Sequence, residues 1–330
     1  MKRRLFLTAV PTTCLIGASS SFSHAHNTSK NGKIIFGFAP KSSGSLLGKK
    51  INQILQATSQ WPVTYEFQNI ENRSSFKALE IVNASSPNDH FLLQALSSQF
   101  SLFPITNKNI SFNLTEAFKP IAVLGTYTWS FVVGPMVPVD VKTMQDYFAW
   151  TQNNSERKNI GVSLNASQGH LIGLLLSSSG KNINKPIVYA GTSGLIHDLL
   201  NQSLPAAMLI TGNAPELFKS QQLRTLSVVS KDRWFSMPDV PCFKELGLPY
   251  LEKEGWFGWF APSTMPSENA ETLSKLVNQS IQSPDGSQTL LDLQIKADIS
   301  TPQQMTEKIA QERIYFDALV KQTRFYHPND

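Results

Sequence analysis

The sequence has few cysteines, few charged residues and no hydrophobic run long enough to span a membrane. Only two of its 330 residues are cysteines, and charged residues make up 16% of the chain, against about 25% in an average soluble domain. A membrane-spanning helix needs roughly 20 consecutive apolar residues, which the chain does not contain. These absences argue against a disulfide-stabilised scaffold and against an integral membrane protein. The 41% of hydrophobic residues suffices for a folded core.

The first 25 residues have the pattern of an export signal. Basic residues at 2–4 precede a mostly hydrophobic stretch at 5–17, and Ser23-His24-Ala25 fits the small-x-small cleavage rule. The paired arginines with the hydrophobic residues after them also fit a twin-arginine signal, so the general secretory and twin-arginine routes both stay open. We predict a signal peptide over residues 1–25 and a periplasmic mature protein.

The charge gives no sign of a nucleic-acid partner. The formal net charge is +5, but residues 1–25 contain three of the 29 basic residues and none of the 24 acidic ones, so the mature chain carries +2. Its lysines and arginines are scattered, and we expect no nucleic-acid binding. The single cysteine left, Cys242, allows no intramolecular disulfide. No histidine or cysteine pair has zinc spacing, and we predict neither a metal nor another cofactor.

Hydrophobic periodicity predicts strands that alternate with helices. The strand-like runs 33–39 and 63–69 flank residues 46–57, where Leu47, Ile51 and Ile54 follow a helical spacing. Such alternation is typical of an α/β protein with parallel sheets covered by helices. Further strands are predicted at 90–95, 121–133, 159–163, 187–189, 206–210 and 226–229, and further helices at 76–82, 169–177, 195–200 and, after a capping box at Thr301, from Pro302 onward.

Several segments, taken in order, resemble one known family. The most specific are the run 223–228 with Arg233, the proline-rich block Pro238–Pro249, and Trp256–Pro262, which is similar to a W-x-G-x-x-A-P motif; shorter matches lie at 87–89, 117–122, 169–171 and 188–192. Together they resemble the Bug-type extracytoplasmic solute receptors associated with tripartite tricarboxylate transporters. The resemblance runs from about residue 33 to the C-terminus.

This resemblance implies a type II periplasmic-binding-protein fold, in which two α/β lobes enclose a small-ligand cleft and the chain crosses between the lobes twice. We place the crossings near 125–133 and 255–261. Lobe one then comprises residues 31–126 plus 260–330, and lobe two comprises 127–259.

Three loops are candidates for the ligand site, because each follows a predicted strand and precedes a predicted helix. In open α/β sheets, ligands bind beyond the carboxyl ends of the strands, and helix N-termini favour anions. Each candidate also has a structural interpretation as a turn or helix-capping residue. The candidates are Pro40, Lys41, Ser42, Ser43, Gly44 and Ser45 in the first loop, Ser163, Asn165, Ser167, Gly169 and His170 in the second, and Gly191, Thr192, Ser193 and Gly194 in the third.

The sequence departs from the family pattern at two of its glycine-rich segments. Residues 40–46 read P-K-S-S-G-S-L where the family has P-x-G-G-S-S-D, and residues 69–75 read N-I-E-N-R-S-S in place of N-R-P-G-A-G-G. Only Gly44 keeps the backbone freedom of the paired glycines. We infer that the chain is a divergent member that retains the family fold but binds a ligand that can differ from those of other members.

The leading hypothesis is a non-catalytic, monomeric receptor that captures a small organic anion, either a di- or tricarboxylate, an amino acid or an aromatic acid. It would deliver this ligand to a membrane permease or a sensor kinase, and the sequence does not separate uptake from sensing. One alternative is a degenerate receptor that binds a protein surface. A second is an exported hydrolase, although the chain has no G-x-S-x-G elbow and no P-loop.

Overall fold

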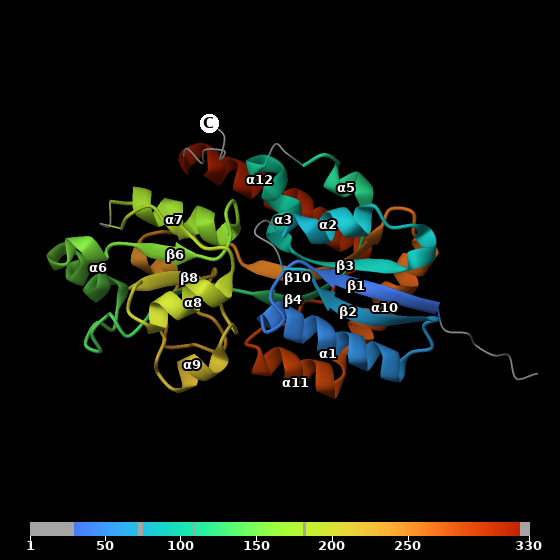
Figure 1. Cartoon of the computed structure of the whole chain (residues 1–330), viewed down its shortest axis with the longest axis horizontal. Helices are drawn as coiled ribbons and strands as arrows, with labels where there is room; N and C mark the ends of the chain where they lie inside the picture. Colours follow the sequence, from blue (N-terminus) through green and yellow to red (C-terminus); the bar gives the residue numbers. More distant parts are fainter. Residues whose placement is uncertain (1–29, 72–74, 108–109, 181–182, 324–330) are drawn as a thin grey trace, which may run out of the picture.

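The computed structural model describes residues 30–71, 75–107, 110–180 and 183–323, so the predicted signal peptide lies outside the described residues. These residues form two five-stranded sheets, which lie side by side along the long axis of the molecule (Figure 1). No helix in these ranges is long and apolar enough to cross a membrane. The two-sheet α/β architecture agrees with the predicted fold class.

The first sheet has the strand order β2-β1-β3-β10-β4. β1 runs parallel to β2 and β3, whereas β10 runs antiparallel to both of its neighbours, β3 and β4. Its strands are β1 (Lys30–Phe36), β2 (Val63–Asn69), β3 (Phe91–Leu96), β4 (Phe118–Tyr127) and β10 (Gly255–Pro262).

Helices cover both faces of the first sheet because its strands carry hydrophobic residues on both sides. Ile34 and Phe36 pack in the cluster that includes α1, and the intervening Ile35 packs with α2 on the opposite face. One face carries α1 (Ser43–Thr58), α10 (Ser267–Gln282) and α11 (Pro284–Asp292), and the other carries α2 (Phe76–Asn83), α3 (Ser97–Ser101) and α12 (Pro302–Thr323), with the short helices α4 (Phe103–Thr106) and α5 (Leu114–Ala117) (Figure 1).

The second sheet has the order β7-β6-β8-β5-β9, with β6 parallel to β7 and β8, and β5 antiparallel to β8 and β9. Its strands are β5 (Trp129–Val133), β6 (Ile160–Val162), β7 (Ile187–Val188), β8 (Ala206–Ile210) and β9 (Arg224–Val229). Its helices are α6 (Met144–Asn153) and α7 (Gln168–Ser178) on one face, and α8 (Thr192–Leu200) and α9 (Pro215–Lys219) on the other (Figure 1).

The predicted parallel arrangement holds for all but one strand of each sheet. The exceptions, β10 and β5, are the strands by which the chain enters each sheet from the other one. A strand that arrives from the neighbouring sheet enters at the edge where the parallel strands end, so it runs in the opposite direction. The predicted strand over 121–133 is accordingly two strands, which break at Thr128.

The run 255–261, predicted to be the second crossing, coincides with strand β10 of the first sheet. Residues 255–262 pair with β4 along their whole length and with β3 over 257–260, so this run is a strand of the first sheet. Its side chains explain why: Trp256 and Trp259 are fully buried there, and their indole nitrogens donate to Glu312 at 2.8 Å and to Gln94 at 2.9 Å. We therefore propose that the lobes divide at Thr128 and just before Gly255.

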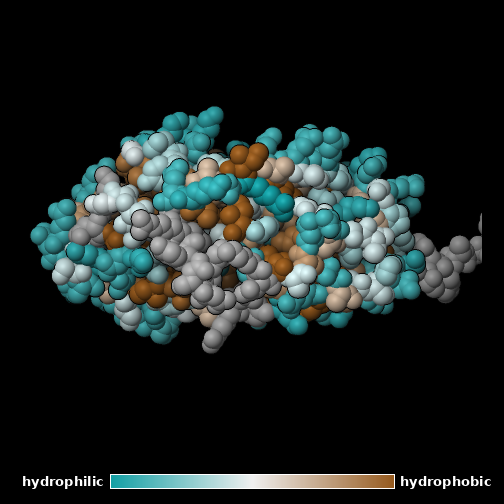
Figure 2. All heavy atoms as spheres, turned by 90° about the horizontal axis from the view of Figure 1, so that it is seen from above, coloured by the Kyte–Doolittle hydropathy of each residue, from teal (hydrophilic) through white to brown (hydrophobic). Residues whose placement is uncertain are grey.

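The C-terminal helix begins at the predicted capping box and packs on the first sheet. Thr301 and Gln304 form the capping box, each accepting a backbone N–H from the other, at 3.2 and 2.9 Å. Met305, Ile309 and Phe316 are buried beneath the helix. From above, the surface is mostly hydrophilic, and hydrophobic residues show mainly toward the middle of the molecule (Figure 2).

Candidate ligand-binding site

A cavity lies between the two sheets, where their parallel strands end. Lining residues follow or terminate β1, β2 and β3 of the first sheet and β6, β7 and β8 of the second. This edge is where open α/β sheets bind ligands. The cavity has a volume of about 50 Å³, and since one water needs about 10–15 Å³, it has room for roughly three to five waters. It therefore suits a small metabolite better than a peptide or a nucleotide.

The start of α1 forms the first-sheet side of the cavity. Ser42 caps the helix, accepting from the Ser45 N–H at 3.4 Å and donating to the Ala39 carbonyl at 2.8 Å. Gly44 is needed for close packing, because a Cβ at this position would lie 2.6 Å from the ring of Phe257. The helix N-terminus thus sits directly over an aromatic ring of β10.

Asn213 joins the two halves of the site. It comes from the turn after β8, and its Oδ1 accepts from both the backbone N–H and the hydroxyl of Ser43, at 3.0 and 2.9 Å. A backbone N–H can only donate, so the amide oxygen must face Ser43 and the Nδ2 group must point elsewhere. Asn213 is 6% exposed, lines the cavity, and its Nδ2 donates no hydrogen bond within the described part of the chain.

The starts of α7 and α8 form the second-sheet side. Ser167 caps α7, accepting from the His170 N–H at 3.2 Å, and it lines the cavity together with Ser163. α8 begins at Thr192 after Gly191, and no side chain caps it. The N–H groups of its first turn therefore lack a side-chain acceptor, and together with the helix dipole they favour a negative group at this end.

Hydrophobic side chains make up most of the remaining wall, and one of them, Trp129, has a polar group without a hydrogen-bond partner among the described residues. Trp129 is 2% exposed, and its indole N–H has no acceptor among the described residues. Its ring packs against α7, where a Cβ on Gly169 would lie 2.5 Å away. An unpaired donor this deeply buried is costly unless an acceptor reaches it. The large hydrophobic side chains of the wall are those of Phe36, Phe38, Leu96, Trp129, Leu164, Ile210 and Phe257.

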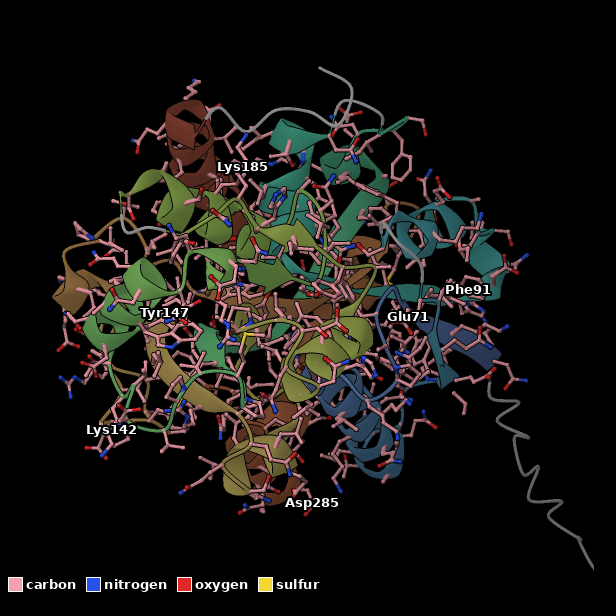
Figure 3. All side chains as sticks on the ribbon, turned by 60° about the vertical axis from the view of Figure 1, so that its left-hand side comes forward. Glu71, Phe91, Lys142, Tyr147, Lys185 and Asp285 are labelled. Atoms are coloured by element: carbon pink, nitrogen blue, oxygen red, sulfur yellow. The ribbon has the colours of Figure 1, made fainter. Side chains whose placement is uncertain are left out.

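Glu71 is the one ionisable residue among the described residues that line the cavity. It follows β2, and its Oε1 lies 3.0 Å from the position that a Cβ on Gly191 would take, so its carboxylate faces the start of α8 across the gap between the sheets. Figure 3 labels it near the centre of the view. Glu71 makes no hydrogen bond or ion pair with any described residue, and it is exposed.

The structure brings part of each predicted loop to the cavity. Ser42, Ser43, Gly44, Ser163, Ser167, Gly191 and Thr192 line it, whereas Pro40, Lys41, Ser45, Asn165, Gly169, His170, Ser193 and Gly194 do not.

The predicted residues that lie outside the cavity have other positions or partners. Pro40, Lys41, Asn165, Ser193 and Gly194 are solvent-exposed, and Gly169 packs on Trp129. The Ser45 hydroxyl donates to Asn69 at 3.1 Å. His170 accepts the Ala166 N–H at 3.2 Å through Nδ1, and burial lowers its pKa to about 4, so it is a neutral residue that closes the loop before α7.

Sequence reasoning missed Asn213, Glu71, Trp129 and Phe257. A signal was present for the first two, because Glu71 follows the predicted strand 63–69 and Asn213 follows the predicted strand 206–210. The rule that selected the three loops therefore applies to these segments as well. Trp129 and Phe257 line the cavity because β5 and β10 run antiparallel, which places the beginnings of these strands at the same edge.

The proline-rich block that supports the family resemblance lies outside the cavity lining. Arg233 binds Glu245 through Nε and Nη2, at 3.0 and 2.8 Å, and Glu245 also accepts the Cys242 N–H at 3.1 Å. The hydrogen bond from Arg233 and the one from Cys242 lower the pKa of Glu245 to about 2. Cys242 is 2% exposed. Across the described ranges, no group of three or more His, Cys, Asp or Glu side chains could hold a metal ion.

Comparison with known proteins gives one family. Residues 68–324 match the family model described as "Tripartite tricarboxylate transporter family receptor". Protein BugT of Bordetella pertussis is 26% identical over 299 residues, which cover 88% of each chain. Two solved structures share the fold at 18% identity: R. palustris Rpa4515 with adipate, with a TM-score of 0.82 over 89% of this chain and 97% of that one, and MatC from Rhodopseudomonas palustris with bound malate, with a TM-score of 0.78 over 88% and 98%.

Proposed function

This chain belongs to the tripartite tricarboxylate transporter receptor family, and from this premise we propose that it is a periplasmic receptor that captures a small carboxylate-bearing metabolite between its lobes. One observation carries the proposal: the starts of α1, α7 and α8 line a single cavity between the two sheets. In support, the related proteins Rpa4515 and MatC have been solved with adipate and malate, both of which are carboxylates.

The cavity offers hydrogen-bond donors suited to a carboxylate. The first turn of α8 has no side-chain cap, Asn213 has an unused Nδ2 group, and Trp129 has an unused indole N–H. A helix N-terminus contributes about 0.3–1 kcal/mol to an exposed anion and up to about 2 kcal/mol to a partly buried one. Each hydrogen bond to a charged ligand adds roughly 1.5–3 kcal/mol before ordering costs. Four such bonds give roughly 6–12 kcal/mol before ordering costs, a range that includes the roughly 8 kcal/mol of micromolar affinity.

The hydrophobic wall defines the rest of the ligand. Phe36 and Phe257 from the first sheet and Trp129 and Ile210 from the second enclose the same space. A hydrocarbon segment next to the carboxylate buries apolar area against these side chains, at roughly 25 cal/mol per Å². We expect the preferred acid to have a short carbon chain, in keeping with the size of the cavity.

In this proposal the loaded receptor serves uptake through a membrane permease or signalling through a sensor kinase. Both roles require that ligand binding change the relative position of the lobes. The Asn213–Ser43 hydrogen bonds couple lobe position to the site, because they join the second sheet to the start of α1 at the wall of the cavity.

Isothermal titration calorimetry against di- and tricarboxylates, amino acids and aromatic acids tests this function. We expect at least one acid to bind with micromolar affinity or better. Thr192→Pro is the diagnostic variant, because proline is tolerated at the first helical position and removes one N–H from the start of α8. It should weaken that acid about tenfold and leave thermal unfolding unchanged. If no acid in the panel binds the wild-type protein, the proposed function is wrong.

A further inference from the structure

We propose that Glu71 selects ligands that carry an ammonium group in addition to a carboxylate, so that the ligand is an amino acid or a short amino carboxylate and not a dicarboxylate. This inference rests on the proposed function, because it concerns the second functional group of an acid bound in the same cavity. Glu71 is the residue that carries it.

The first argument is the charge of the cavity. No lysine, arginine or histidine is among the described residues that line it, and Glu71 adds one negative charge. A monocarboxylate can rely on helix N-termini and neutral donors. A dicarboxylate would place a second negative charge in a small space that already holds a carboxylate, and like charges repel more strongly as water is excluded. A ligand ammonium group reverses the sign of this interaction.

The second argument is the position of the Glu71 carboxylate. It faces the start of α8 across the gap between the sheets and has no hydrogen-bond or ion-pair partner among the described residues. A carboxylate accepts short, charge-assisted hydrogen bonds from an ammonium group. Because it is in place and unpaired, Glu71 needs no rearrangement of other side chains to receive one.

The third argument is that the Glu71 carboxylate lies beside unused donors. It faces the start of α8, whose first-turn N–H groups have no side-chain cap. These N–H groups favour the carboxylate of a ligand, and an ammonium group on the same ligand can then meet Glu71. An amino acid carries both groups on one short carbon chain and therefore fits this end of the cavity.

The test compares pairs of compounds of similar shape by calorimetry: aspartate with malate, 4-aminobutyrate with glutarate, and valine with 3-methylbutanoate. In the wild-type protein the ammonium-bearing member of at least one pair should bind ten times more tightly than its partner. Glu71→Gln should reduce this preference to less than threefold. Glu66→Gln is the matched control, because Glu66 is an exposed glutamate on β2 that does not line the cavity, and it should leave the preference unchanged.

The outcomes separate the two proposals. If acids bind but the members without an ammonium group bind equally well or better, or if the preference survives in Glu71→Gln, the role of Glu71 is refuted and the receptor function stands. If none of the six compounds and no acid of the wider panel binds the wild-type protein, both proposals fail. Circular dichroism of both variants verifies that an altered preference is not caused by misfolding.

Discussion

Gly212 provides the sharpest test of whether the lobes must close for binding. It lies in the turn after β8, has a φ of 89°, and faces the carbonyl oxygen of Leu293 at the end of α11 in the first lobe. A Cβ at this position would lie 2.0 Å from that oxygen. Gly212→Ala therefore introduces two separate costs, one from backbone strain and one from a clash across the lobes.

Gly247 separates these two costs. It has a φ of 80°, and a Cβ there would meet nothing within 4 Å. A left-handed conformation costs an alanine about 1–2 kcal/mol at either position. Only Gly212→Ala adds the clash, and overpacking of this kind typically costs about 1–3 kcal/mol. Opening the lobes relieves the clash without unfolding, so this energy shifts the balance between open and closed forms by about 5-fold to 150-fold.

The two variants should therefore have similar free energies of unfolding, within about 1 kcal/mol of each other, but different affinities. Calorimetry with the acid that binds the wild-type protein most tightly should show binding to Gly212→Ala that is about 5-fold to 150-fold weaker than binding to Gly247→Ala. Small-angle X-ray scattering should show a larger radius of gyration for Gly212→Ala. Equal affinities and equal radii in the two variants would refute the reasoning, because the contact with Leu293 would then be irrelevant to closure.

Three further variants test individual groups. Burial lowers the pKa of His170 to about 4, so between pH 6.5 and pH 4 this histidine takes up a proton in the unfolded chain but not in the folded one. The wild-type protein should therefore lose up to about 3 kcal/mol of unfolding free energy over this range, and His170→Gln should lose less. Trp129→Phe should change the unfolding free energy by less than about 1 kcal/mol, because relief of the unpaired indole N–H offsets the lost volume, but should weaken acid binding about tenfold. Glu312 is buried, its carboxylate accepts a hydrogen bond from Trp256 at 2.8 Å, and desolvation raises its pKa. Glu312→Gln should therefore be about 1 kcal/mol more stable than the wild-type protein at pH 8, where the buried carboxylate is charged. The gain should be smaller at pH 5, because a raised pKa leaves part of the carboxyl protonated there.

Chemical denaturation at several pH values and calorimetry decide these three cases. An unchanged pH dependence in His170→Gln would show that other groups cause the acid sensitivity. Full acid affinity in Trp129→Phe would mean that the indole N–H does not meet the ligand. A less stable Glu312→Gln at pH 8 would mean that the ion pair with Lys253, at 3.8 Å, outweighs the desolvation of Glu312.

Local patterns were sufficient to locate most elements but not the way in which the strands pair. Strands 63–69 and 206–210 were predicted with the boundaries that the structure has, because turn residues, alternating hydrophobic residues and short hydrophobic runs are local signals. The place of β10 between β3 and β4 is not a local property. It arises because the chain returns from the second sheet, and the buried run Trp256–Phe260 looks the same in sequence whether it bridges two lobes or fills one core.

The site was predictable to the extent that it depends on helix starts. Ser42 and Ser167 were candidates because their loops lie between a predicted strand and a predicted helix, and both residues cap helices and line the cavity. Lys41 and His170 were included as members of the same loops, but Lys41 is exposed and His170 accepts a backbone N–H. Side-chain chemistry alone does not reveal which way a loop residue faces, and that direction is set by packing across the lobes.

The antiparallel strands link the ligand cavity to the crossings between the lobes. Each sheet receives the chain at the edge where its parallel strands end, so the first residues after the crossings lie beside the cavity. Trp129 directly follows the break at Thr128, and Phe257 is the third residue of β10. A ligand that touches these two side chains contacts the segments whose backbone must rotate when the lobes move. In the proposed receptor, binding would favour one lobe arrangement through this contact, and we expect substitutions at Trp129 to change the affinity and the opening equilibrium together.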